Sequence, residues 1–123
     1  MPKTIFTIED DFFLQELEVA RFKKEGFNVL AASNSKDFFD VLAKNPKIDL
    51  ILLDLMLPDV DGFEVLKIIK KEPSLVNTPI VVFSNLSEEK DIEKAKEIGI
   101  NEFMIKSNFH LDQLVSKVRE LIK

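Results

Sequence analysis

The order of apolar runs along the chain limits the fold more than any other feature. Short apolar runs alternate with longer segments of helical spacing, and no Pro/Gly-rich linker or low-complexity segment separates them. The expected strands are 4–8, 27–32, 49–53, 79–83 and 102–105, and the expected helices are 12–25, 35–45, 63–71, 87–98 and 108–122. This alternation predicts an α/β fold, with a doubly wound parallel sheet, helices on both faces and one domain.

Helical spacing indicates how two of these helices are built. In the first helix Phe13, Leu17 and Ala20 recur at helical spacing, and Gly26 supplies a stop. The fourth helix is highly charged, and we expect only three of its residues to face the core: Ile92, Ala95 and Ile98. A helix with so few apolar contacts should be thinly anchored.

Several small polar residues stand where helices should begin. Asp11 is the expected N-cap of the first helix, and Ser35 the expected cap of the second. Asp61 and Glu64 are spaced like a capping box for the third helix. Asp59 and Asp61 lie in the sequence PDVDG, so we interpret both as turn and capping residues.

The charge balance and the absence of cysteine exclude several classes of function. The net charge is −5, with basic residues scattered among acidic ones, so direct binding to nucleic acid is not expected. No run approaches the roughly 20 apolar residues that span a bilayer, and MPKTIF lacks the layout of a secretion signal. Without cysteine there is no disulfide, thiolate metal site or cysteine nucleophile, and we expect a cytoplasmic protein.

Polar side chains stand at the ends of four expected strands. The run from Ile48 to Leu53 reads as a strand buried on both faces, yet it ends in an ionisable group. In an open parallel sheet, ligands bind beyond the carboxyl ends of the strands. We therefore expect one site that gathers the residues at these ends: Glu9, Asp10, Asp11, Asp54, Ser84 and Lys106.

The residue types at these strand ends favour one kind of chemistry. Clustered carboxylates repel one another unless a cation neutralises them, and a set of oxygen donors suits Mg²⁺. The Lys106 ammonium and the Ser84 hydroxyl suit the oxygens of a phosphoryl group. We therefore hypothesise that Asp54 is a nucleophile that accepts a phosphoryl group, while the metal and Lys106 neutralise charge on the transferring oxygens.

Four segments carry a resemblance to a known family. IFTIEDD, LLDLMLPDVDG, VVFS and FMIK together resemble the receiver domain of bacterial two-component response regulators, each at the expected strand end and in the same order. The resemblance covers essentially the whole chain. It implies a five-stranded, flavodoxin-like sheet in the order 2-1-3-4-5. Because no residues are left for an output domain, we expect a stand-alone, chemotaxis-regulator-like receiver domain over residues 1–123.

The resemblance also implies a role for each site residue. Asp54 corresponds to the phosphoacceptor, and the Ser84 hydroxyl and Lys106 to the groups that contact the phosphoryl group. Glu9 and Asp10 correspond to the acidic pair of the metal site. The implied Mg²⁺ ligands are Asp10, Asp54 and the Met56 carbonyl, with Glu9 beside them, and the implied switch residues are Ser84 and Phe103.

What the resemblance implies about signalling follows from these roles. A histidine kinase is the expected phosphodonor, and phosphorylation should draw Ser84 inward, move Phe103 and change the surface formed by the fourth helix, fifth strand and last helix. The thin anchoring of the fourth helix agrees with such a shift. The expected partners are that kinase and an unknown downstream protein, with the chain a monomer or weak dimer.

Three positions depart from the family pattern. Ser107 follows Lys106 where the family usually has proline, which raises the question of whether that bond is cis. Asn85, after the switch hydroxyl, is larger than the residue usual there, and Glu9 replaces the commoner aspartate.

Met56 and Leu86 are apolar at positions that, in this family, influence the approach of water to the phosphoryl group. Their apolar character predicts slow self-dephosphorylation.

Other interpretations remain open on the sequence alone. A pseudo-receiver that only binds partners would keep these residues without using them. A hydrolase of the haloacid dehalogenase type also uses an aspartate nucleophile and Mg²⁺, but it generally needs an aspartate at the position of Met56. Phe103 could be one more core residue among eleven phenylalanines, and the single His110 has no second histidine for a metal site.

Overall fold

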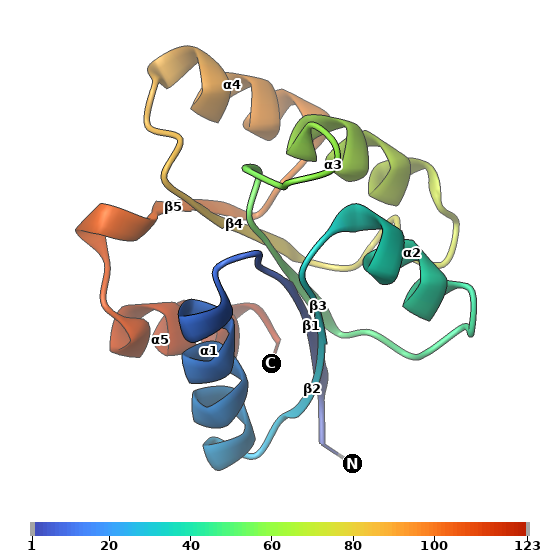
Figure 1. Cartoon of the computed structure of the whole chain (residues 1–123), viewed down its shortest axis with the longest axis vertical. Coiled ribbons are helices and arrows are strands. Elements are labelled where there is room, and N and C mark those ends of the chain that lie inside the picture. The colour runs from blue at the N-terminus through green and yellow to red at the C-terminus, as the bar shows by residue number, and fades with distance from the viewer. Residues whose placement is uncertain (1, 123) are drawn as a thin grey trace.

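The computed structural model describes residues 2–122 and contains the predicted alternation of strands and helices (Figure 1). The elements are β1 (Thr4–Ile8), α1 (Phe12–Lys24), β2 (Asn28–Ala32), α2 (Ser35–Leu42), β3 (Leu50–Leu53), α3 (Gly62–Lys71), β4 (Ile80–Ser84), α4 (Glu89–Ile98), β5 (Glu102–Ile105) and α5 (Leu111–Leu121). A short 3₁₀ turn, Lys106–Asn108, joins β5 to α5.

All five strands are parallel, in the order β2-β1-β3-β4-β5, which confirms the predicted fold class. The register brings the ends of neighbouring strands level, because Ile8 pairs with Leu53 and Ser84 pairs with Ile105. The residues that follow β1, β3 and β5 therefore emerge at the same edge of the sheet.

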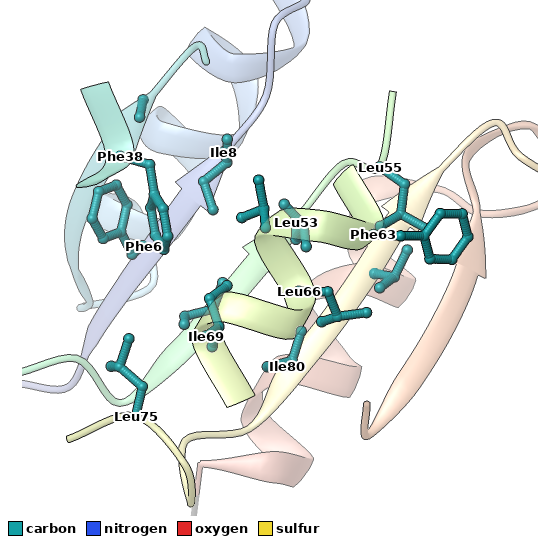
Figure 2. Close-up of a cluster of buried hydrophobic side chains, with 14 of the residues drawn as sticks. Phe6, Ile8, Phe38, Leu53, Leu55, Phe63, Leu66, Ile69, Leu75 and Ile80 are labelled. Carbon is teal, nitrogen blue, oxygen red and sulfur yellow. The ribbon is translucent and has the colours of Figure 1, made fainter. Parts of the chain in front are cut away.

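Two layers of helices bury the two faces of the sheet. α1 and α5 cover one face, and α2, α3 and α4 cover the other (Figure 1). Alternate residues of β3 point to opposite faces. Ile51 and Leu53 join the cluster under α2 to α4, in which Figure 2 labels Leu53, and Leu50 and Leu52 join the cluster under α1 and α5. The strand is buried on both faces, as its sequence predicts.

α1 is rotated relative to the apolar pattern of its sequence. Phe13 is 77% exposed and Leu17 58%, whereas the buried residues of the helix are Glu18 and Phe22. The helical spacing of Phe13, Leu17 and Ala20 therefore does not mark the buried face of α1. Glu18 can occupy that face because its carboxyl finds a hydroxyl partner there, the side chain of Thr7 on β1.

The helix starts differ from prediction at three places. The N-cap of α2 is Asn34, whose side chain accepts a hydrogen bond from the Asp37 N–H, and Ser35 is the first helical residue. α4 begins at Glu89, two residues after Ser87. α5 begins at Leu111 because the 3₁₀ turn takes up residues 106–108.

The predictions for Asp11, Asp61 and α4 hold better. Asp11 caps α1 by accepting a hydrogen bond from the Leu14 N–H, and Asp61 caps α3 by accepting from the Phe63 N–H. The capping box expected from Asp61 and Glu64 does not form within the described residues, because Glu64 pairs with Lys67, the i+3 residue of its own helix. In α4 only Ala95 is buried, with Ile92 and Ile98 partly exposed, which confirms thin anchoring.

Within residues 2–122, no helix combines the length and apolar character needed to cross a membrane.

Candidate functional site

The Asp54 side chain is the centre of the site at the carboxyl edge of the sheet. It directly follows β3 and is only 4% exposed. Its Oδ1 accepts hydrogen bonds from the Ser84 hydroxyl at 2.8 Å and from the Met56 N–H at 2.9 Å. Its Oδ2 accepts a hydrogen bond from the Lys106 ammonium at 2.6 Å. The ends of β3, β4 and β5 thus meet on one carboxylate.

Glu9 shares the Lys106 ammonium with Asp54. The Glu9 carboxylate, 1% exposed, lies 2.7 Å from Lys106 Nζ and accepts a hydrogen bond from the Asp11 N–H. Burial raises the pKa of the Glu9 carboxyl to about 7, although these hydrogen bonds act to lower it. Burial acts to lower the pKa of Lys106, but hydrogen bonds to Asp54 and Glu9 outweigh it and the pKa is raised.

A third carboxylate completes the acidic cluster. Asp10 is exposed, and oxygens of Glu9, Asp10 and Asp54 all lie within 4.8 Å of one another. The Lys106 ammonium contacts two of these three carboxyl groups, Glu9 and Asp54, which leaves an excess of negative charge when all three are ionised. An all-oxygen set with excess negative charge fits a hard divalent cation such as Mg²⁺.

Two of the three positions that depart from the family pattern lie at the rim of the site, whereas the third, Glu9, is buried within it. Asn85 and Ser107 are both exposed. The residues that the structure describes contain no cis peptide bond, so the bond between Lys106 and Ser107 is trans. Phe103 is partly buried and packs against the hydrophobic cluster under α2, α3 and α4. It therefore lies on the face of the sheet that α4 covers.

Asp59 contacts a different helix from the one that it precedes. Its carboxylate accepts hydrogen bonds from the Ser35 hydroxyl at 2.7 Å and from the N–H groups of Ser35 and Lys36, each at 3.1 Å. These bonds, first that of the Ser35 hydroxyl, lower the pKa of Asp59. His110 is exposed and is the N-cap residue of α5, where its own N–H donates to the Gln113 side chain.

Sequence reasoning missed two polar residues of α1 that lie against β1. Gln15 donates hydrogen bonds to the Glu9 and Ala32 carbonyls. Glu18 accepts a hydrogen bond from the Thr7 hydroxyl at 2.7 Å, and burial raises its pKa to about 8. The signal in the sequence for Glu18 is Thr7, a buried hydroxyl between two buried apolar residues of the strand, Phe6 and Ile8.

A comparison with protein families decides the classification. The model of the response regulator receiver domain family matches residues 5–119. The chain belongs to this family. Receiver domains are signalling switches rather than classical enzymes; they receive phosphoryl groups from histidine kinases and interact with downstream partners. The acidic cluster, the hydroxyl and the ammonium described above are therefore found together in a receiver domain.

Individual relatives agree with this classification. The cell cycle response regulator CtrA of Brucella ovis is 33% identical over 119 residues, which cover 97% of this chain and 50% of that protein. The receiver domain thus spans about half the length of the curated relatives that it matches.

Two solved structures share both the fold and a substantial part of the sequence. The Mn²⁺-bound form of the response regulator Rcp1 is 31% identical, with a TM-score of 0.82, and the alignment covers 97% of this chain and 91% of that one. The phosphorylated cyanobacterial phytochrome response regulator RcpA is 30% identical, with a TM-score of 0.86, covering 99% and 94%.

Proposed function

We propose that residues 1–123 form a phosphoryl-accepting signalling switch in which Asp54 is the phosphoacceptor. The observation that carries this proposal is the environment of Asp54: a buried carboxylate held between a hydroxyl, Ser84, and an ammonium, Lys106. Each of these groups can contact a phosphoryl oxygen once Asp54 carries the phosphoryl group.

Mg²⁺ is the proposed cofactor. Its ligands would be Asp10, Asp54 and the Met56 carbonyl, with Glu9 close to them, and the three carboxyl groups are already clustered. The relative Rcp1 has been solved in a Mn²⁺-bound form, which supports a divalent cation as the cofactor. When bound, such an ion neutralises negative charge on a transferring phosphoryl group.

The proposed reaction transfers a phosphoryl group from a phosphohistidine. One Asp54 oxygen forms a bond to phosphorus while the bond from phosphorus to the imidazole nitrogen breaks, and the nitrogen keeps the electron pair. The Lys106 ammonium neutralises an oxygen of the transferring group, and the Ser84 hydroxyl donates to another. Both groups already contact Asp54, so little rearrangement is needed to reach the new oxygens.

Exposed apolar side chains near the site support a protein phosphodonor, which we propose is a histidine kinase. α1 exposes Phe12, Phe13 and Leu17 directly after the acidic pair. The loop after β3 exposes Met56 and Val60, which line a hollow together with Asp10. Large apolar side chains around a polar site are typical of a surface that binds another protein. We propose that this kinase transfers the phosphoryl group to Asp54 in the cytoplasm.

The proposed output is a change in the surface formed by α4, β5 and α5, where an unidentified downstream protein would bind. Ser84 ends β4, and Phe103 lies on the neighbouring strand β5, on the face that α4 covers. α4 buries only Ala95, so a shift of this helix disturbs little of the core. Phosphorylation need only bias an equilibrium between two positions of these elements.

Intact-mass spectrometry tests the proposal. Wild-type protein incubated with Mg²⁺ and acetyl phosphate should gain the mass of one phosphoryl group, and Asp54→Asn should not. Removing Mg²⁺ with a chelator should abolish the gain in wild type. If the wild type gains no mass under conditions that label another receiver domain, the chain is a pseudo-receiver that binds partners without phosphorylation.

A further inference from the structure

The segment that carries the acidic pair leaves the sheet after Ile8. Glu9 continues the ladder by one bond, because its N–H donates to the Ala32 carbonyl at 3.0 Å, and Asp11 already caps α1. Asp10 lies between them. Within residues 2–122 its exposed carboxylate makes no hydrogen bond or ion pair, so only the backbone, through the direction of the Cα–Cβ bond, aims this side chain at the cluster.

The amide of Gln15 holds that backbone. Its Nε2 donates to the Glu9 carbonyl at 2.9 Å and to the Ala32 carbonyl at 3.0 Å, and it lies 3.3 Å from the Ser33 hydroxyl. The NH₂ end of the amide carries two hydrogens, one for each carbonyl oxygen, and the Ala32 carbonyl accepts this bond in addition to that from the Glu9 N–H. Gln15 therefore ties the ends of β1 and β2 to the first turn of α1.

The Glu9 carbonyl belongs to the planar peptide unit that joins Glu9 to Asp10, so a bond to this oxygen also fixes the position of the Asp10 Cα. We propose that Gln15 is a positioning residue that directs the Asp10 carboxylate toward Glu9 and Asp54 for a divalent cation. The inference rests on the proposed function insofar as that cation binds at this cluster. Residues that orient metal ligands in this way strengthen binding without touching the ion.

The chain contains a matched control for this role. Gln113 on α5 also bonds a backbone group with its side-chain amide, accepting from the His110 N–H at 2.7 Å. It contacts none of the acidic residues of the site. If Gln15 had a purely structural role, its replacement would affect metal affinity no more than replacement of Gln113 does. If Gln15 is a positioning residue, only its own replacement lowers the affinity for the metal.

The test compares ¹⁵N-labelled wild type, Gln15→Met and Gln113→Met in titrations with Mg²⁺, followed by the amide signals of residues 10 and 11. Gln15→Met should bind Mg²⁺ about tenfold more weakly, the lower end of the range for residues that orient ligands. Gln113→Met should keep the wild-type affinity. Thermal unfolding without metal should show both variants folded at the temperature of the titration, and saturating Mg²⁺ should restore phosphorylation of Gln15→Met by acetyl phosphate.

Two results would overturn the inference while leaving the proposed function intact. One is a wild-type Mg²⁺ affinity in Gln15→Met. The other is an equal loss of affinity in Gln113→Met, which would mean that any destabilised variant binds metal poorly. A wild-type protein that binds no Mg²⁺ would overturn both this inference and the proposed metal-dependent switch.

Discussion

The carboxylate of Asp54 is buried at the end of an apolar strand, a placement that is costly unless its oxygens are satisfied. A hydroxyl, a backbone N–H and an ammonium supply hydrogen bonds to both oxygens. Lys106 serves Glu9 as well, so one cation holds two carboxylates. At the scale of single residues, this sharing links the charge of the acidic pair to that of Asp54.

Replacement of Met56 tests the prediction that the phosphoryl group on Asp54 is lost slowly. It is 52% exposed beside Asp54 and cannot hold a water molecule for attack on phosphorus. Met56→Asn should release phosphate roughly tenfold faster, the effect of one hydrogen bond of about 1.4 kcal/mol that positions the attacking water. Val60→Asn, an exposed position of the same loop, is the control. Equal rates in wild type and Met56→Asn would contradict the prediction.

The raised pKa of the buried Glu18 carboxyl predicts that the folded protein loses stability as the pH rises. Burial raises the pKa of its carboxyl from 4.5 to about 8, so between these values the folded state holds a proton that the unfolded state releases. The free energy of unfolding should therefore fall by a few kcal/mol as pH rises from about 5 to about 8. Glu18→Gln, which cannot ionise, should show a smaller decline.

Urea denaturation at pH 5 to 9 measures this difference. Glu16→Gln, at an exposed position of the same helix, is the control and should follow the wild-type pH profile. Indistinguishable pH profiles for wild type and Glu18→Gln would show that Glu18 does not hold the extra proton.

At the scale of elements, the loop between β3 and α3 is fixed by a helix that is distant in sequence. Asp59 accepts three hydrogen bonds from the first residues of α2, two from N–H groups and one from the Ser35 hydroxyl. The same loop carries Met56, whose carbonyl is a proposed metal ligand. The start of α2 and the proposed metal site are thus connected through one carboxylate.

Replacement of Asp59 should destabilise the fold through α2. Asp59→Ala leaves the N–H groups of Ser35 and Lys36 without their partner, and the melting temperature should fall by about 3 to 8 °C, as for the loss of a helix cap. Asp40→Ala, which removes only an exposed ion pair with Lys36, should change it little. Equal effects of the two substitutions in a thermal melt would argue against the capping role.

α4 should be the least protected helix on its face of the sheet. It buries only Ala95, whereas α3 buries five residues, Gly62, Phe63, Val65, Leu66 and Ile69. Amides of α4 should exchange with deuterium at least about tenfold faster than those of α3, because local opening exposes less apolar surface. Hydrogen exchange followed by mass spectrometry measures this ratio. Equal protection of α3 and α4 would contradict the account of an easily shifted helix.

At the scale of the whole molecule, local patterns of the sequence predicted the parallel α/β fold and the residues that gather at the edge of its sheet, and the resemblance to receiver domains supplied the strand order. The local patterns are ones that tertiary structure reinforces: apolar runs of strand length, and polar residues directly after them. Asp54, Ser84 and Lys106 follow or end three neighbouring strands, so a correct strand order was sufficient to bring them together.

What the sequence did not predict depends on side-chain partners that only the folded chain supplies. The rotation of α1 could not be read from its apolar residues, because Glu18 takes an inward position by pairing with Thr7. Asp59 follows the pattern of a turn residue, yet its partners lie on α2. Gln15 carries no motif at all, and its role follows from two carbonyls that converge at the ends of β1 and β2.

The central claim is that this edge of the sheet makes Asp54, among several neighbouring acidic residues, the phosphoryl acceptor. Borohydride reduction of the protein after treatment with Mg²⁺ and acetyl phosphate, followed by peptide sequencing in a mass spectrometer, locates the acyl phosphate directly. The account predicts reduced aspartate at position 54 and none at Asp10 or Asp11. Modification at either of those residues, with Asp54 unmodified, would contradict it.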